Sequence, residues 1–156
     1  MKTLIATALI ALFMISCKSG EGLSKEETIS QITDKVESQN YKFVPTAALP
    51  ASGKSINLNY SYSLDISKDT VDSYLPYFGR AYVAPISTDE GGIKFVCTDF
   101  EYTQIKGKKD MWEVVIKPRD NAKRYTLTLQ IGNTGYATLT VQDTNRQTIS
   151  FYGKIE

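Results

Sequence analysis

The sequence predicts a mainly β protein, in which an antiparallel meander forms a curved sheet or small barrel preceded by one N-terminal helix. Most of the chain alternates apolar and polar residues with a period of two, which indicates strands with one buried face. The connectors between these runs are short and rich in Gly, Asn and Asp, so consecutive strands are antiparallel neighbours. Near the start, apolar residues recur at intervals of three and four, which indicates a helix. A two-sheet sandwich is the alternative architecture.

The helix is predicted over residues 25–38. Ser24 followed by Glu27 is the pattern of a capping box, in which each side chain binds the backbone N–H of the other residue. Ile29, Ile32 and Val36 then form one apolar stripe.

The strands are predicted in three groups. Residues 41–49 contain Pro45 and favour an edge strand or arm, because proline cannot donate a hydrogen bond within a central strand. Residues 56–66 alternate without a slip and predict one long, half-buried strand. Residues 92–156 predict a five-stranded meander with one face toward water. The helix, the first strands or closure into a barrel could cover its other face.

The composition excludes several classes of protein. The 156 residues suffice for one domain, and 18 basic against 17 acidic residues provide no broad basic surface, so we expect no nucleic-acid partner. Histidine is absent, which excludes Ser–His–Asp and Cys–His nucleophiles and His-ligated zinc. No other pattern nominates a catalytic residue, a metal site or a cofactor, and we expect none.

The first 16 residues predict a secretory signal peptide. Lys2 provides a basic start, and the apolar run from Thr3 to Ile15 is shorter than the roughly 20 residues that a transmembrane helix needs. The run ends in Met14-Ile15-Ser16-Cys17, which resembles the lipobox of bacterial lipoproteins. In those proteins the leader is cleaved before the cysteine, here between Ser16 and Cys17, and the thiol receives a diacylglycerol. The alternatives are a plain cleaved signal with an incidental Cys17 and a buried N-terminal helix.

Lipidation of Cys17 would anchor the chain to membrane lipid without crossing the membrane. Each buried methylene contributes about 0.8 kcal/mol, so two or three acyl chains hold durably. Loss of residues 1–16 removes one basic residue and leaves 17 basic and 17 acidic residues, so charge adds little to membrane binding. We expect residues 17–23 to form the lipidated tether and residues 24–156 a single domain. We expect it in the bacterial cell envelope, anchored to the outer membrane on its periplasmic or its surface face.

Residues 74–82 depart from the alternation and form the candidate ligand-binding segment. Tyrosines combine an apolar ring with a polar tip, as carbohydrate- and peptide-binding surfaces require, and arginine pairs with carboxylates or stacks on rings. The candidate ligand-binding residues are Tyr74, Tyr77, Phe78, Arg80 and Tyr82. The alternative is a connection across the end of the sheet, with rings that plug the core and hydroxyls bonded to the backbone.

Carboxylates and one thiol are the candidate catalytic groups of the sequence. A glycosidase needs two carboxylates about 5–10 Å apart across a cleft, and no spacing nominates such a pair. Solvated carboxylates are the simpler interpretation of Asp65, Asp69, Asp72, Asp99 and Glu101. Cys97 lies in a strand-like stretch beside Asp99, which favours an inert thiol.

Three short motifs resemble a known family. They are Tyr74-Leu75-Pro76-Tyr77-Phe78-Gly79-Arg80-Ala81-Tyr82, Gly91-Gly92-Ile93-Lys94-Phe95, and Asn145-Arg146-Gln147 with Ile149-Ser150-Phe151-Tyr152-Gly153. Together with the leader, they resemble the uncharacterised Bacteroidetes lipoproteins grouped as domain of unknown function 4251, over roughly residues 40–156. The resemblance implies an envelope lipoprotein and brings no activity, catalytic residue or cofactor.

The leading functional prediction is therefore a lipid-anchored envelope protein with a non-enzymatic binding or accessory domain. Its expected partners are membrane lipid, through acylated Cys17, and an envelope protein or glycan. One alternative is a carboxylate-dependent hydrolase of glycans or peptides. The other is a structural or assembly lipoprotein, which a contiguous exposed apolar patch would favour.

Overall fold

The computed structural model describes residues 24–59, 61–82, 91–120, 122 and 124–156. The predictions of a signal peptide, of cleavage between Ser16 and Cys17, of lipidation and of a tether lie outside these residues. The described part contains one α-helix, ten β-strands and one short 3-10 helix. They are α2 Lys25–Ser38, β1 Tyr41–Pro50, β2 Ile56–Asn57, β3 Ser63–Ile66, β4 Val71–Pro76, β5 Gly92–Cys97, β6 Phe100–Lys106, η2 Lys108–Asp110, β7 Trp112–Pro118, β8 Tyr125–Ile131, β9 Tyr136–Asp143 and β10 Arg146–Ile155.

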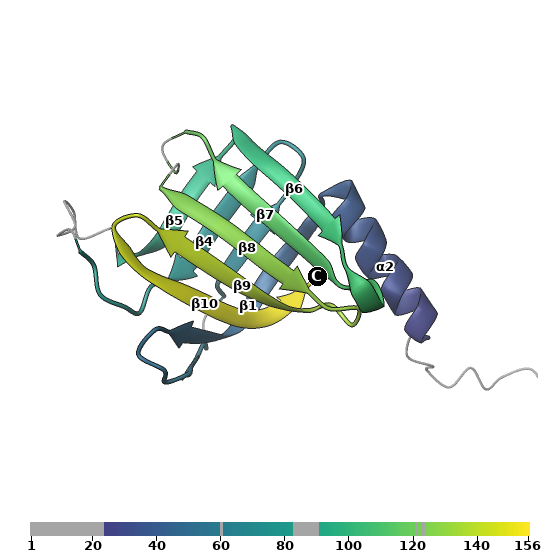
Figure 1. Ribbon diagram of the computed structural model, residues 1–156, viewed down its shortest axis with the longest axis horizontal. Helices are drawn as coiled ribbons and strands as arrows, with labels where there is room; N and C mark the ends of the chain where they lie inside the picture. The colour runs from purple at the N-terminus through teal and green to yellow at the C-terminus, as the bar shows by residue number, and fades with distance from the viewer. Residues whose placement is uncertain (1–23, 60, 83–90, 121, 123) are drawn as a thin grey trace, which may run out of the picture.

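The strands form one antiparallel sheet that curls into a nearly closed barrel (Figure 1). Its order is β5-β4-β3-β1-β10-β9-β8-β7-β6, and the short β2 pairs with β1 beside this path. Strands β6–β10 make the front layer of Figure 1, and β1, β4 and β5 lie behind them. The prediction of a mainly β fold with a curved or barrel-like antiparallel sheet is confirmed.

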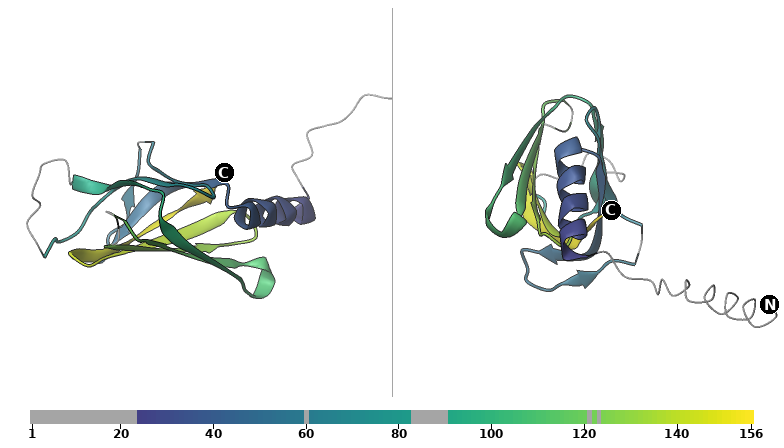
Figure 2. Two further views of the ribbon diagram at one scale, coloured as in Figure 1. Left: turned by 90° about the horizontal axis from the view of Figure 1, so that it is seen from above. Right: turned by 90° about the vertical axis from the view of Figure 1, so that its right-hand side faces the viewer.

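Helix α2 lies at one end of this flattened barrel (Figure 2). The Ser24 hydroxyl accepts a hydrogen bond from the Glu27 N–H at 3.2 Å, and the Glu27 carboxylate accepts one from the Ser24 N–H at 2.8 Å. The helix ends at Gln39, whose left-handed φ of 52° stops further turns. Ile32 and Val36 are buried. The predicted helix is confirmed at both ends.

The core occupies the inside of the curl. Each strand of the front layer turns alternate apolar residues inward, so two layers of side chains meet between the faces. The largest fully buried side chains include Phe43, Leu64, Ile93, Ile116, Leu129, Leu139 and Phe151.

The prediction of a five-stranded meander gives the right number of strands, but it includes residues 92–97, which do not belong to the meander. Strands β6–β10 form it, whereas residues 92–97 pair with β4 at the other edge of the sheet. Alternation continues on both sides of Thr98 and Asp99, so the sequence pattern does not reveal that the chain leaves one edge there and enters the other.

The single long strand predicted over residues 56–66 is also wrong. Ala47 pairs with Asn57, while Phe43 pairs with Leu64. The chain thus advances four residues along β1 and seven along its partner. The additional residues of the partner cannot pair with β1, and they lie between β2 and β3.

Strand β1 lies between β3 and β10, so the prediction of an edge strand is wrong as well. Pro45 falls in the interval between the pairings with β3 and β2, where no ladder N–H is required. On the other side, the register with β10 shifts between Pro45 and Ala47, opposite Gly153. An interrupted ladder on one side and a bulge on the other therefore admit a proline to a central strand.

We expect Gly153→Ala to lower the free energy of unfolding by about 2–3 kcal/mol. A Cβ there would lie 2.2 Å from the Val44 carbonyl oxygen and 2.7 Å from the Pro45 Cα, so backbone must move. Denaturant unfolding followed by circular dichroism measures the change. Gly91→Ala is the control, because a Cβ at Gly91 meets no atom within 4 Å. Equal stability of the two variants would contradict this account of the bulge.

Candidate functional site

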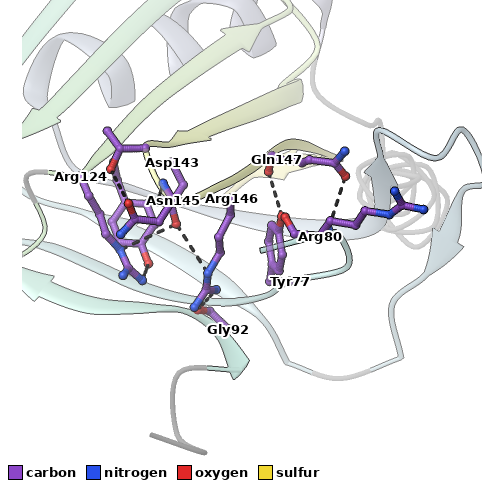
Figure 3. A network of polar contacts seen from close by, with 10 residues as sticks. Tyr77, Arg80, Gly92, Arg124, Asp143, Asn145, Arg146 and Gln147 are labelled. Carbon is purple, nitrogen blue, oxygen red and sulfur yellow. Dashed lines mark hydrogen bonds and ion pairs between the residues drawn. The ribbon is translucent and has the colours of Figure 1, made fainter. Parts of the chain in front are cut away.

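A network of polar contacts closes the end of the barrel opposite α2 (Figure 3). The Tyr77 hydroxyl shares its proton between the backbone carbonyls of Arg80 at 2.9 Å and Gln147 at 3.1 Å. The Arg80 N–H donates to Gln147 Oε1, and the Gln147 N–H returns a bond to the Arg80 carbonyl. The Tyr82 N–H donates to the Asn145 carbonyl at 2.8 Å. Residues 77–82 are thus fastened to the turn between β9 and β10.

Behind this segment, a buried carboxylate lies between two guanidinium groups. Asp143 Oδ2 is 3.7 Å from the Nε atoms of both Arg124 and Arg146, an ionic contact too long for a hydrogen bond. The Asp143 and Arg146 side chains are only 3% and 7% exposed. Arg146 also donates to the Gly92 carbonyl at 3.1 Å and lies 5.0 Å from the centroid of the Tyr77 ring. Asp143 is therefore the central charge of this end of the barrel.

The turn between β9 and β10 is shaped by the same carboxylate. Asp143 Oδ1 accepts a hydrogen bond from the Asn145 N–H at 2.8 Å, which is the usual way in which aspartate stabilises a turn two residues on. One side chain thus holds the turn with one oxygen and pairs with two arginines through the other.

The five candidate ligand-binding residues occupy different environments. Tyr77 is engaged with backbone carbonyls, and burial raises the pKa of its hydroxyl. Phe78 is half-buried against the core. Arg80 uses its backbone in the network, and its side chain is exposed. Tyr74 and Tyr82 are exposed by 47% and 69%. Tyr77 and Phe78 thus contact other parts of the fold, whereas Tyr74, Arg80 and Tyr82 are exposed.

Tyr74 lies on strand β4 rather than in an irregular connection. Its ring stacks on Tyr62, with centroids 5.8 Å apart, and the Lys94 ammonium lies 4.9 Å from its centroid. The structure therefore separates Tyr74 from residues 77–82, which follow the end of the strand.

The candidate carboxylates face solvent. Asp69, Asp72, Asp99 and Glu101 are exposed, and Asp65 is half-buried. Asp65 and Asp72 lie directly opposite each other on β3 and β4, beside an open hollow of about 500 Å³. Asp65 is 2.9 Å from the Lys42 ammonium and accepts a bond from Ser63 at 2.7 Å. Asp65 is thus engaged by an ammonium and a hydroxyl group of the chain itself, and Asp72 is exposed.

Cys97 is buried, and its thiol donates to the Asp99 carbonyl at 3.1 Å. Burial, with the nearby Asp120 carboxylate, raises the pKa of this thiol. A raised pKa suppresses the reactive thiolate at neutral pH.

The network joins the three segments that carry the family resemblance. Tyr77 and Arg80 come from the first, Gly92 from the second, and Arg146 and Gln147 from the third. The amino-acid sequence of residues 24–155 matches the family described as a domain of unknown function, DUF4251. The chain belongs to the DUF4251 family.

A solved structure supports the fold of this DUF4251 chain. The crystal structure of a DUF4251 family protein from Bacteroides eggerthii superposes with a TM-score of 0.58 at 9% sequence identity. The match covers 82% of this chain and 86% of that protein. At this identity the likeness concerns the fold alone. A comparison with curated protein sequences found no match.

In the part of the DUF4251 chain that the structure describes, no helix is long and apolar enough to span a membrane. Nor, among those same residues, do three His, Cys, Asp or Glu side chains gather where a metal ion could be held.

Sequence reasoning missed the charged centre of the DUF4251 network. Asp143 follows Ala137, Leu139 and Val141 at the same period of two, so the alternation places a carboxylate at an inward position. This was the available signal, and the turn residues that follow Asp143 concealed it.

We expect Tyr77→Phe to lower the free energy of unfolding by about 1–2 kcal/mol, because it removes the proton shared by two backbone carbonyls. Thermal and denaturant unfolding measure the change. Tyr82→Phe, at a ring that is 69% exposed, is the matched control and should leave stability unchanged. If both variants are as stable as the original chain, the network does not brace this end of the barrel.

We expect Asp143→Asn to lower the free energy of unfolding by about 2–4 kcal/mol, because two guanidinium groups lose their shared buried counter-charge. The control is Asp65→Asn, which breaks a solvent-exposed ion pair with Lys42 and should cost less than about 1 kcal/mol. Similar losses in both variants would show that burial adds nothing to the Asp143 contacts.

Proposed function

We propose that this chain is a lipid-anchored protein of the bacterial cell envelope, attached to the outer membrane, whose β domain binds a partner and performs no catalysis. The observation that carries the anchoring is Met14-Ile15-Ser16-Cys17 at the end of an apolar run too short to span a membrane. The resemblance to Bacteroidetes lipoproteins supports the same assignment.

The shape of the domain is consistent with an anchor at its N-terminal side. The first turn of α2 lies at the outer tip of the helix, away from the barrel (Figure 2). A lipid attached through the residues before Ser24 would therefore hold the molecule by its helical end. The broad outer faces of the sheet would remain accessible to a partner.

Binding is favoured over catalysis by the state of the groups that could react. Asp65 is paired with the Lys42 ammonium and accepts a hydrogen bond from Ser63, and the other candidate carboxylates face solvent. The Cys97 thiol is buried with a raised pKa. The chain has no histidine. The expected partner is an envelope protein or glycan.

Metabolic labelling with radioactive palmitate tests the anchor. We expect the full-length protein, made in a bacterial host that processes lipoproteins, to incorporate label and to sediment with membranes. Cys17→Ala should lose both properties, because it removes the acylated sulfur. Cys97→Ala is the matched control and should keep the label, since this thiol is buried in the domain. Label that survives in Cys17→Ala would refute the anchoring.

A further inference from the structure

The outer face of strands β8, β9 and β10 is almost free of charge. The residues that these three fully described strands turn outward are Thr, Ser, Gln and Tyr, and Lys154 is the one charged side chain among them. We call this surface the neutral face. In Figure 1 it points toward the viewer, and no described helix or loop crosses it.

The outer surface of the other layer differs in charge. Lys42, Asp65, Asp72 and Lys94 lie there on β1, β3, β4 and β5, and Lys42 forms an ion pair with Asp65. Within the front layer, Glu101 on β6 and Glu113 and Lys117 on β7 are exposed, so the nearly charge-free area is confined to β8–β10. A neutral face provides no attraction for nucleic acid, anionic lipid or a charged peptide.

Hydroxyl groups form an ordered row across the neutral face. Thr128 lies directly opposite Thr140, and Thr140 lies directly opposite Ser150, so three side chains follow one another on adjacent strands. Neighbouring strands are about 4.8 Å apart, which sets the spacing along the row. Thr140 Oγ1 and Ser150 Oγ are 3.0 Å apart and share a hydrogen bond. Each hydroxyl can both donate and accept, as the hydroxyls of a sugar do.

Two tyrosines lie further along the same strands: Tyr152 is two residues after Ser150 on β10, and Tyr136 is four residues before Thr140 on β9. The rings of Tyr136 and Tyr152 are nearly parallel, at 9°, with centroids 6.2 Å apart. They are 53% and 45% exposed. The Lys154 ammonium lies 5.7 Å from the Tyr136 centroid. The stacking and this cation–π contact hold the rings in place, so binding would cost little side-chain entropy.

We propose that the neutral face binds an uncharged polysaccharide. A sugar ring has an apolar C–H face and a rim of hydroxyl groups. The tyrosine rings match the first, and the Thr and Ser hydroxyls match the second. A lipid-binding surface needs continuous apolar area, which a face of Thr, Ser, Gln and Tyr does not offer. The core of a protein interface is enriched in Tyr but depleted in Ser, so the hydroxyl row favours a sugar. The inference specifies the partner of the proposed binding domain and is independent of the lipid anchor.

Affinity electrophoresis and calorimetry of the full-length chain in detergent test the proposal. The probes are four soluble uncharged polysaccharides: a mixed-linkage β-glucan, glycogen, a galactomannan and an arabinoxylan. We expect at least one of them to retard and bind the protein. Tyr136→Ser combined with Tyr152→Ser should raise its Kd at least tenfold. Thr128→Val combined with Thr140→Val, which removes two hydroxyls at nearly constant shape, should raise it severalfold.

The chain contains a matched control on its other surface. Tyr62 and Tyr74 stack in the same way, with the Lys94 ammonium over one ring. Tyr62→Ser combined with Tyr74→Ser should leave the Kd within twofold, and circular dichroism shows whether each variant is folded.

The proposal is overturned if no probe binds, if the Tyr136 and Tyr152 variant binds normally, or if both variants lose binding equally. Loss in the control alone would assign the ligand to the surface around Tyr74. Palmitate labelling of the same proteins is unaffected by any of these outcomes, so the anchor is judged separately.

Discussion

The two-residue connection of Thr98 and Asp99 constrains the whole fold. It joins β5 and β6, which are the two end strands of the sheet order. The Cα atoms of Cys97 and Phe100 can be at most about 11 Å apart across such a link. The opposite edges of a long sheet must therefore meet at this corner, and the sheet has to curl. Because every strand turns its apolar side to the inside of that curl, burial of apolar area and the short connection favour the same shape.

A curled sheet leaves two open ends, and this chain closes them by different means. At one end α2 buries Ile32 and Val36, and the Tyr102 hydroxyl lies 3.4 Å from the Val36 carbonyl, which fastens the helix to β6. At the other end residues 77–82 are joined to the turn after β9 mainly through backbone groups and the buried Asp143. Backbone polar groups at strand ends need hydrogen-bond partners. The polar network provides them at this end of the barrel, whereas the apolar face of α2 covers the other end.

The fold class and the helix could be read from the sequence because both depend on periodicity. Six alternating positions in 56–66 and the capping box around Ser24 are local patterns, and local patterns report which face of an element is buried. They do not report which strands are neighbours. Residues 92–97 alternate like the strands of the meander but pair with β4. Pro45 lies in a central strand because the ladder is interrupted on one side and bulged on the other. Of the candidate site, sequence reasoning selected the right segment and missed its charged centre, since Asp143 meets Arg124 only when β8 and β9 pair.

The packing of the interior restricts where a ligand of the proposed binding domain could lie. Phe43, Phe151 and the other large core residues are fully buried, and they come from both layers of the barrel. Protein interiors of this kind are packed as densely as organic crystals, so no small molecule can enter without displacing them. A binding domain of this architecture must therefore use its outer surfaces or its ends. One end is occupied by α2 and the other by the brace around Tyr77, and the surface over β1, β3, β4 and β5 carries opposite charges in contact. The neutral face is an outer surface on which exposed aromatic rings and ordered hydroxyl groups occur on the same strands.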